Sequence, residues 1–366
     1  MPTRSRARRS SRSVAPSRNR GLGGQIALVA GATRGAGRGI ARALGEAGAT
    51  VYCTGRSVAG RPSPYKRPET VDETAALIEA AGGRAIAVRV DHTVEAEVEA
   101  LVARIVKEYG RLDVLVNSIA GEEPLMGQWG SFWQVDVAHA DDVLRQALVS
   151  HIVTAKHVAR RMIRQRRGLI VEVTESDILG AGGNPLAWSV KLATKGLALN
   201  MAAELRAHNV TAVAMTPGYL RSEAMLEAKG VTEANWRDAG RQDSNFLESE
   251  SPLFVGRAVA ALAQDPEMLA RTGQLWSSWQ LSRDYGFTDI DGRRPDWGAR
   301  ETLDFSMFPP SFLELFRVGL ELQARWLANL SERTAGALRQ LPTQAARRRR
   351  PVEPRRTARS AKTSRR

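Results

Sequence analysis

A short apolar run that leads into a glycine-rich turn constrains this chain more than any other stretch. Residues 25–30 are apolar without polar alternation, which indicates a strand buried on both faces of a sheet. The turn that follows contains Gly31, Gly35 and Gly37. Residues 38–47 then carry small and apolar side chains at helical spacing. Backbone N–H groups converge where such a turn opens a helix, and the helix dipole favours negative charge, so the stretch predicts a phosphate-binding dinucleotide site.

The alternation of strand and helix continues along the chain and indicates its fold class. Further strands are expected at residues 49–53, 85–90, 112–116, 169–174, 211–215 and 273–281. Helices are expected between them, at residues 71–81, 94–109, 141–165, 188–208 and 252–263. This order predicts an α/β fold, a doubly wound parallel Rossmann-type sheet with helices on both faces. The loops that follow the strands are expected to lie along one edge of that sheet.

Charge separates a folded part from two basic tails. The net charge is +14, but residues 1–20 contribute +7 and residues 347–366 contribute +9, which leaves about −2 between them. With little to bury, residues 1–22 and 341–366 are predicted to be disordered. Residues 23–298 are predicted to form one domain.

Two segments lie outside the regular alternation. The polar segment 219–251 follows the expected strand edge and is predicted to be a lid. Residues 299–340 carry apolar side chains at helical intervals and are predicted to form a C-terminal helical extension. Packing on the domain or on a second subunit would explain this extension, and so would attachment to a membrane surface, which its balanced charges make less favourable.

Cysteine content and hydropathy indicate the cellular compartment in which the protein is expected. Cys53 is the only cysteine, so no intramolecular disulfide can form, and a cytoplasmic protein is expected. No run of 18 apolar residues occurs, so no membrane span is expected. No metal site is predicted.

Four elements together resemble the short-chain dehydrogenase/reductase family. They are Gly31-x-x-x-Gly35-x-Gly37, the strand end at 112–117, Lys191 in the helix after the fifth strand, and Thr216-Pro217-Gly218. The resemblance covers about residues 25–295, and is to a branch with a lengthened turn after the fourth strand and a Trp/Phe-rich insert. It implies a homo-oligomeric oxidoreductase that uses a nicotinamide dinucleotide on a carbonyl or alcohol substrate.

Two arginines predict which dinucleotide binds. Arg34 lies inside the glycine turn and Arg56 lies just past the second strand, where no acid stands at residues 54–57 to bond ribose hydroxyls. A guanidinium group matches the geometry of an adenosine 2′-phosphate, so NADP is expected rather than NAD. The remaining cofactor-binding positions that the resemblance implies are Gly31, Thr33, Gly35, Gly37, Asp91, Asn117, Lys191, Pro217, Gly218 and Ser222.

The resemblance also implies roles for these positions. Asp91 would accept from the adenine amino group, although a helix N-cap explains it almost as well. Asn117 would tie neighbouring strands together beside the cofactor. Lys191 would bond the nicotinamide ribose and lower the pKa of a nearby acid. The Pro217-Gly218 turn would cover the nicotinamide, and the Ser222 hydroxyl would bond its carboxamide.

The proton-donating position departs from the family pattern. The family acid is a Tyr four residues before the lysine, and this chain has Ala187 there. The family serine falls at Thr174 or Glu175, and the asparagine that anchors a proton-relay water maps onto His151. The catalytic residues are therefore predicted to be Lys191, Thr174 and His151.

Three functions compete on these grounds. The first is an NADP(H)-dependent oxidoreductase of a small, apolar carbonyl or alcohol, in which His151, Tyr219 or water supplies the proton. The second is a catalytically degenerate relative that binds NADP(H) as a sensor or scaffold. The third is nucleic-acid binding, which rests only on the tails and would be non-specific.

Overall fold

The computed structural model describes residues 21–62, 67–121, 132–134, 137, 140–175 and 184–299. The chain divides into two units, Met1–Thr302 and Leu303–Arg366, of which the second lies outside the described residues. The tail at 341–366 and the predicted helical extension, apart from Ala299, lie outside them too. Within the described part of the chain, no helix combines the length and apolar character that crossing a bilayer requires.

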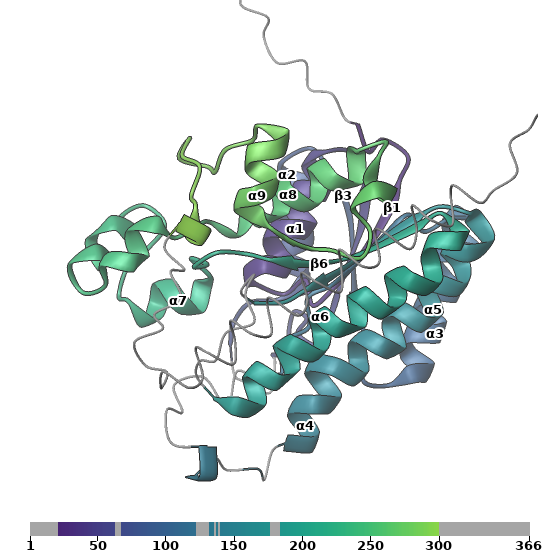
Figure 1. Cartoon of the computed structure of the whole chain (residues 1–366), viewed down its shortest axis with the longest axis horizontal. Helices are drawn as coiled ribbons and strands as arrows, with labels where there is room; N and C mark the ends of the chain where they lie inside the picture. The colour runs from purple at the N-terminus through teal and green to yellow at the C-terminus, as the bar shows by residue number, and fades with distance from the viewer. Residues whose placement is uncertain are drawn as a thin grey trace, which may run out of the picture. The chain divides into compact units, whose positions relative to one another are not determined.

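A parallel sheet, seven-stranded over the described residues, forms the middle layer of the domain (Figure 1). Its strands are β1 (Ile26–Ala30), β2 (Thr50–Gly55), β3 (Arg84–Arg89), β4 (Val114–Asn117), β5 (Gly168–Val173), β6 (Val210–Thr216) and β7 (Leu275–Ser277). Their order is β3-β2-β1-β4-β5-β6-β7, and every neighbouring pair is parallel. The predicted doubly wound Rossmann-type fold is confirmed. Strand order reverses beside β1, and sheets of this kind bind ligands at such a switch point.

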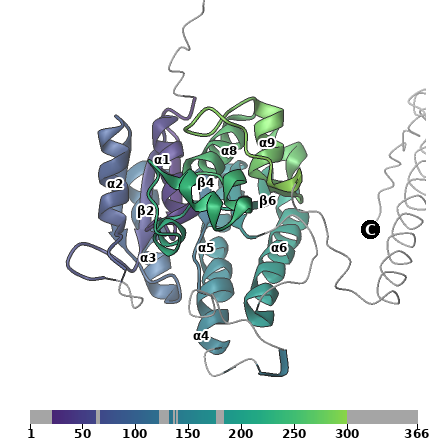
Figure 2. The same cartoon turned by 90° about the vertical axis from the view of Figure 1, so that its left-hand side faces the viewer.

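Helices cover both faces of the sheet (Figures 1 and 2). One face carries α1 (Gly35–Glu46), α2 (Val71–Ala80), α8 (Pro252–Gln264) and α9 (Ser278–Tyr285). The other face carries α3 (Glu95–Tyr109), α5 (Ser150–Gln165) and α6 (Pro185–Leu205). Strand side chains alternate between two cores, so Val29 packs on the first face and Leu28 on the second. Both residues are fully buried, as the unbroken apolar run predicts.

Short helical segments complete the described chain. The α-helices among them are α4 (Ala140–Leu144) and α7 (Glu223–Ala228), and η3 (Arg145–Val149) is a π-helix that joins α4 to α5. The 3₁₀ segments are η2 (Phe132–Gln134), η4 (Arg206–His208), η5 (Trp236–Arg241), η6 (Ser244–Glu248), η7 (Met268–Arg271) and η8 (Trp297–Ala299).

Several boundaries differ from the sequence-based expectation, and two of them change the assignment of a residue or segment. The predicted strand at 273–281 is wrong in its second half, because α9 begins at Ser278, directly after β7. A capping box causes the change: the Ser277 side chain accepts from the Gln280 N–H, and the Gln280 side chain accepts from the Ser277 N–H. Leu22, predicted to belong to the N-terminal tail, is fully buried in the first core.

The segment of residues 219–251, which the sequence predicts to be a lid, is organised around one buried arginine. Arg221 stacks on Trp236, with its guanidinium carbon 4.2 Å from the ring centroid. Its Nη2 atom lies 3.2 Å from the Asp289 carboxylate and 2.9 Å from that of Glu233. Since a buried cation is stable only when paired, these contacts fix the lid to the segment that follows α9.

Glu250, at the end of the lid, binds the turn that follows β6. Its Oε2 atom accepts from the Gly218 N–H at 3.0 Å and from the Ser278 hydroxyl at 2.5 Å. Its Oε1 atom is buried without a hydrogen-bond partner among the described residues. Burial raises the pKa of Glu250 to about 8; nearby Asp289 raises it too, while the two hydrogen bonds and Arg221 oppose the shift.

We expect Glu250→Gln to weaken the pH dependence of stability. The folded chain keeps a proton on Glu250 up to about pH 8, whereas the ordinary pKa is 4.5, so the contribution of Glu250 to stability falls as the pH rises between these values. Glutamine keeps an acceptor for Gly218 and Ser278, and the difference in unfolding free energy between pH 5 and pH 8 should shrink by ~1–3 kcal/mol. Urea unfolding at the two pH values measures it.

Glu227→Gln serves as the control, because its carboxylate is 71% exposed. That variant should keep the pH dependence of the natural chain. An unchanged pH dependence in Glu250→Gln would show that Glu250 is already ionised in the folded protein at pH 5 and would contradict the raised pKa.

Candidate functional site

The glycine turn between β1 and α1 is closed by backbone contacts. The Gly31 and Ala32 N–H groups donate to the Thr54 carbonyl at 2.9 and 3.0 Å. Gly31 has a φ of +85°, and a Cβ there would lie 2.5 Å from the Ser118 carbonyl oxygen. A Cβ on Gly37 would collide with the Gly31 carbonyl oxygen. Glycine is therefore required at both positions, and the turn presents main chain to a ligand at the N-terminus of α1.

The two arginines expected to bind a 2′-phosphate follow segments that touch each other. A Cβ on Gly55 would lie 2.8 Å from the Thr33 hydroxyl oxygen, so the residues beside Arg34 and Arg56 are in contact. The Arg56 Nη2 atom donates to Gln146 Oε1 in η3 at 2.9 Å. The fold thus brings both arginines to the carboxyl edge of β1 and β2.

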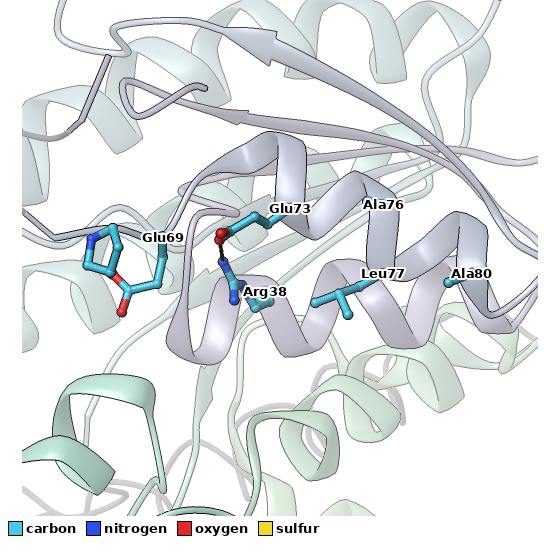
Figure 3. Close-up of a pocket in the computed structure, with 7 residues that line it drawn as sticks. Arg38, Glu69, Glu73, Ala76, Leu77 and Ala80 are labelled. Atoms are coloured by element: carbon cyan, nitrogen blue, oxygen red, sulfur yellow. Dashed lines mark hydrogen bonds and ion pairs between the residues drawn. The ribbon is translucent and has the colours of Figure 1, made fainter. Parts of the chain in front are cut away.

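An acidic residue accompanies these arginines. Glu69 is buried just before α2, and its carboxylate accepts from Arg67 at 2.6 Å. Although burial opposes the shift, the Arg67 hydrogen bond and the nearby Arg34 charge lower the pKa of Glu69. Figure 3 shows a surface hollow between α1 and α2 that Glu69 lines together with Arg38, which binds Glu73.

Asp91 follows β3 and lies close to Arg56. Its carboxylate accepts from the Thr93 N–H at 3.0 Å and from the Thr93 hydroxyl at 2.7 Å. Burial opposes the change, but these bonds and the Arg56 charge lower the pKa of Asp91. The N-cap of α3 is Val94, so the alternative that Asp91 caps this helix is wrong.

Asn117 joins β4 to β5 and α5. Its Nδ2 atom donates to Glu172 Oε1 at 2.8 Å and to the His151 carbonyl at 3.2 Å. Glu172 lies opposite Asn117 in the register of β4 and β5 and is fully buried. Sequence reasoning missed Glu172, although a single acid inside the apolar run 168–173 is an available signal for a buried partner.

His151 shares a proton with Glu172. The imidazole Nδ1 atom lies 2.6 Å from Glu172 Oε2, and the Nε2 atom lies 3.0 Å from the Ile119 carbonyl oxygen. Because a carbonyl only accepts, Nε2 carries a hydrogen, and one further proton lies between Nδ1 and the carboxylate. The ring is 2% exposed. His151 is thus half of a buried proton-sharing pair.

A second buried histidine lies nearby and stays neutral. The His92 ring lies between the Thr54 and Thr154 hydroxyls, at 2.8 and 2.9 Å. Burial, followed by the neighbouring His151, lowers the pKa of His92 to about 3. His92 thus has hydroxyl partners and is neutral, whereas His151 has a carboxylate partner with which it shares a proton.

Thr174 and Lys191 are brought together, but through the lysine backbone. The Thr174 hydroxyl donates to the Lys191 carbonyl at 2.9 Å, which fastens the end of β5 to α6 and uses the threonine proton. Ala187, one helical turn before Lys191, packs against the buried cluster of Val143, Ala147 and Val190. An alanine side chain has no proton to give.

The turn after β6 meets the glycine turn. The Ser222 side chain caps α7 by accepting from the Met225 N–H at 3.3 Å. A Cβ built on Gly35 would lie 3.7 Å from the Ser222 Cβ, so the two turns are in contact. Pro217 and Gly218 lie between β6 and this contact. The Glu250 carboxylate accepts a hydrogen bond from the Gly218 N–H.

Tyr219 is a poor proton donor in this arrangement. Its hydroxyl donates to the Asp243 carboxylate at 3.0 Å. Burial and that carboxylate raise the pKa of Tyr219. The phenol is therefore protonated, with its proton committed to Asp243.

Comparison with known proteins agrees with this fold. Residues 25–232 match the model of the short chain dehydrogenase family. The mouse dehydrogenase/reductase SDR family member 1 is 37% identical over 274 residues, which cover 74% of this chain and 84% of the relative.

Two solved structures are similar as well. A short-chain dehydrogenase/reductase from Burkholderia xenovorans superposes with a TM-score of 0.58 at 26% identity, over 70% of this chain and 95% of that one. A metagenomic short-chain oxidoreductase in complex with NADP has a TM-score of 0.52 at 26% identity, over 68% and 93%. The fold, the glycine turn and these matches together show that the chain belongs to the short-chain dehydrogenase/reductase family, whose members are generally oxidoreductases that bind NAD(P).

Proposed function

We propose that the protein is an NADP(H)-dependent oxidoreductase of a small, apolar carbonyl or alcohol, with a proton donor that replaces the family tyrosine. The observation that carries this proposal is the backbone cradle at Gly31 and Gly37 beside Arg34 and Arg56. A phosphate-rich ligand fits such a cradle, because N–H groups and guanidinium groups both favour anions. The similar metagenomic oxidoreductase in complex with NADP supports the choice of cofactor.

Different residues of the described chain would bind different parts of the cofactor. The glycine turn, including Thr33 and Gly35, would hold the pyrophosphate, and Asp91 and Asn117 would border the adenosine half. Lys191, Pro217, Gly218 and Ser222 would hold the nicotinamide half. When bound, the cofactor supplies or accepts a hydride. Placing it against a substrate is itself worth a large part of the rate.

Carbonyl reduction also needs a proton, and four candidate positions differ in their ability to give one. Ala187 has none, the Thr174 proton is donated to Lys191, and the Tyr219 proton is donated to Asp243. His151 shares its proton with Glu172. We therefore assign the proton reservoir to this pair, with water carrying the proton to the substrate because the ring is buried.

The second candidate function is a sensor or scaffold that binds NADP(H) without turnover. It is favoured by Ala187, whose half-buried side chain packs on the buried cluster of Val143, Ala147 and Val190. Cofactor binding without carbonyl reduction would select this function over the first.

We propose that the protein forms a homo-oligomer through α5 and α6. Val149 precedes α5, Ile152 lies on it and Leu199 lies on α6; all three apolar side chains are more than a third exposed. The cytoplasm remains the proposed compartment, on the single, buried Cys53. Contact of the basic tails with nucleic acid remains a prediction on residues outside the described part.

Arg56→Ala should weaken the binding of NADPH and leave NADH almost unaffected. Loss of a charge-assisted bond to the 2′-phosphate costs ~1–3 kcal/mol, and NADH lacks that phosphate. Titration of protein fluorescence with each cofactor measures the difference. Arg61→Ala, an exposed arginine in the following loop, is the matched control. Equal losses for NADPH and NADH would rule out the assigned role of Arg56.

Ala187→Tyr should raise the rate of NADPH oxidation with ketones and aldehydes. A phenol there lies one helical turn before Lys191, whose charge lowers a phenol pKa, and a general acid is worth ~10²–10⁴ in rate. Ala187→Phe adds the same ring without the hydroxyl and controls for altered packing against Val143. Steady-state absorbance at saturating NADPH gives both rates. If the phenylalanine variant gains as much, the hydroxyl is not the cause and the tyrosine position is misplaced.

A further inference from the structure

Glu223 places a carboxylate at the phosphate-binding end of α1. It is the first residue of α7, and its Oε2 atom accepts from the Gly35 N–H at 2.7 Å. Its Oε1 atom lies 3.3 Å from Arg38 Nη1. The side chain is 27% exposed, so it lies partly in solvent. One carboxylate thus spans a backbone N–H group of the glycine turn and a guanidinium group.

Arg38, the cationic partner of Glu223, lies on α1 and is held by contacts with the glycine turn and with α2. Arg38 Nε donates to the Thr33 carbonyl at 3.0 Å, and Arg38 Nη2 lies 3.0 Å from Glu73, as the dashed line in Figure 3 marks. The Arg38 side chain is 16% exposed. These contacts hold Arg38 in place without Glu223. The groups that bind the Glu223 carboxylate therefore belong to the nucleotide-binding half of the domain.

The lid is in close contact with the turn at the same point. A Cβ built on Gly35 would lie 3.7 Å from Ser222 Cβ and 3.9 Å from Leu220 Cδ2. One helical turn further along α7, Glu227 pairs with Arg67 at 2.8 Å. Two carboxylates on one short helix therefore connect the lid to residues on the nucleotide side, and only Glu223 reaches the glycine turn.

A carboxylate and a phosphate seek the same groups at a helix N-terminus. Both accept from the backbone N–H groups and both gain from the positive end of the dipole. Two negative groups that lie a few Å apart repel each other. In a partly buried site the solvent screens this repulsion only weakly. A pyrophosphate bound at Gly35 would therefore oppose the Glu223 carboxylate in its observed place.

We propose that Glu223 is a built-in competitor of the cofactor pyrophosphate. A dinucleotide that binds the glycine turn displaces the Glu223 carboxylate from Gly35, and this displacement loosens α7. Cofactor binding is then coupled to the position of the lid, and the coupling lowers cofactor affinity. This inference rests on the proposed function, since it takes the glycine turn as a dinucleotide site.

Glu223→Gln removes the charge and keeps an acceptor for the Gly35 N–H. We expect it to bind NADPH and NADH about tenfold more tightly than the natural chain, a change of about 1.4 kcal/mol. The gain should be equal for the two cofactors because both contain the pyrophosphate. Adenosine 2′-monophosphate, which lacks it, should bind the two proteins alike. Isothermal titration calorimetry at low salt measures all three ligands.

Glu227→Gln is the matched control, with the same charge removed one turn along the same helix. It should leave every affinity within about twofold of the natural chain, as for an exposed ion pair. An equal gain in Glu227→Gln would assign the effect to general charge and overturn the proposal. So would natural affinity for NADPH in Glu223→Gln, and in that case the proposed function would stand.

Hydrogen exchange without any cofactor provides a second readout. Peptides that cover residues 219–231 should exchange faster in Glu223→Gln than in the natural chain and in Glu227→Gln, because glutamine loses the ion pair with Arg38 and keeps only a neutral hydrogen bond to the Gly35 N–H. Unchanged exchange there would overturn the proposal. If neither the natural chain nor Glu223→Gln binds NADPH or NADH, the proposed function fails and the competition fails with it.

Discussion

The close backbone packing of the glycine turn is the constraint on which the rest of this structure depends. The Gly31 and Ala32 N–H groups bond the end of β2, and positions 31 and 37 leave no room for a Cβ beside the Ser118 and Gly31 carbonyls. Strands β1, β2 and β4 therefore meet at the point where strand order reverses. The residues that follow these strands therefore lie along one edge of the sheet.

Local patterns in the sequence are sufficient to predict the sheet and the turn. Buried parallel strands appear as unbroken apolar runs, and glycine spacing marks the turn, so both follow from neighbouring residues. The contacts of the site could not be predicted in this way. Glu172 lies 55 residues from Asn117, and Glu223 lies 188 residues from Gly35. Such contacts depend on the tertiary fold. The start of α9 is different, since the capping box of Ser277 and Gln280 is a local signal that outweighs the apolar run before it.

The hydrogen bonds of the site commit some protons to fixed acceptors and leave one shared between two groups. The Thr174 hydroxyl and the Tyr219 phenol both donate to fixed acceptors, and each bond holds two segments together. The proton between His151 and Glu172 faces two groups that can each hold it. It lies at the junction of the π-helix η3 with α5, and such irregular turns are frequent at functional sites. We propose that a reservoir at this position acts through water and takes the role of the family tyrosine, whose position we predict to be Ala187.

Carboxylates near the start and at the end of the segment 219–251 bind the main chain of the two turns of the candidate site. Glu223 reaches the glycine turn at its start, and Glu250 holds the Gly218 N–H at its end. Their surroundings differ, because Glu250 is fully buried, which raises its pKa, whereas Glu223 lies partly in solvent beside Arg38. A neutral anchor is indifferent to an arriving anion, but a charged one is repelled by it. Main-chain hydrogen bonds of Glu250 with Tyr219 and Arg221 hold the start and the end of the segment together, so the displacement that we propose at Glu223 would be confined to α7.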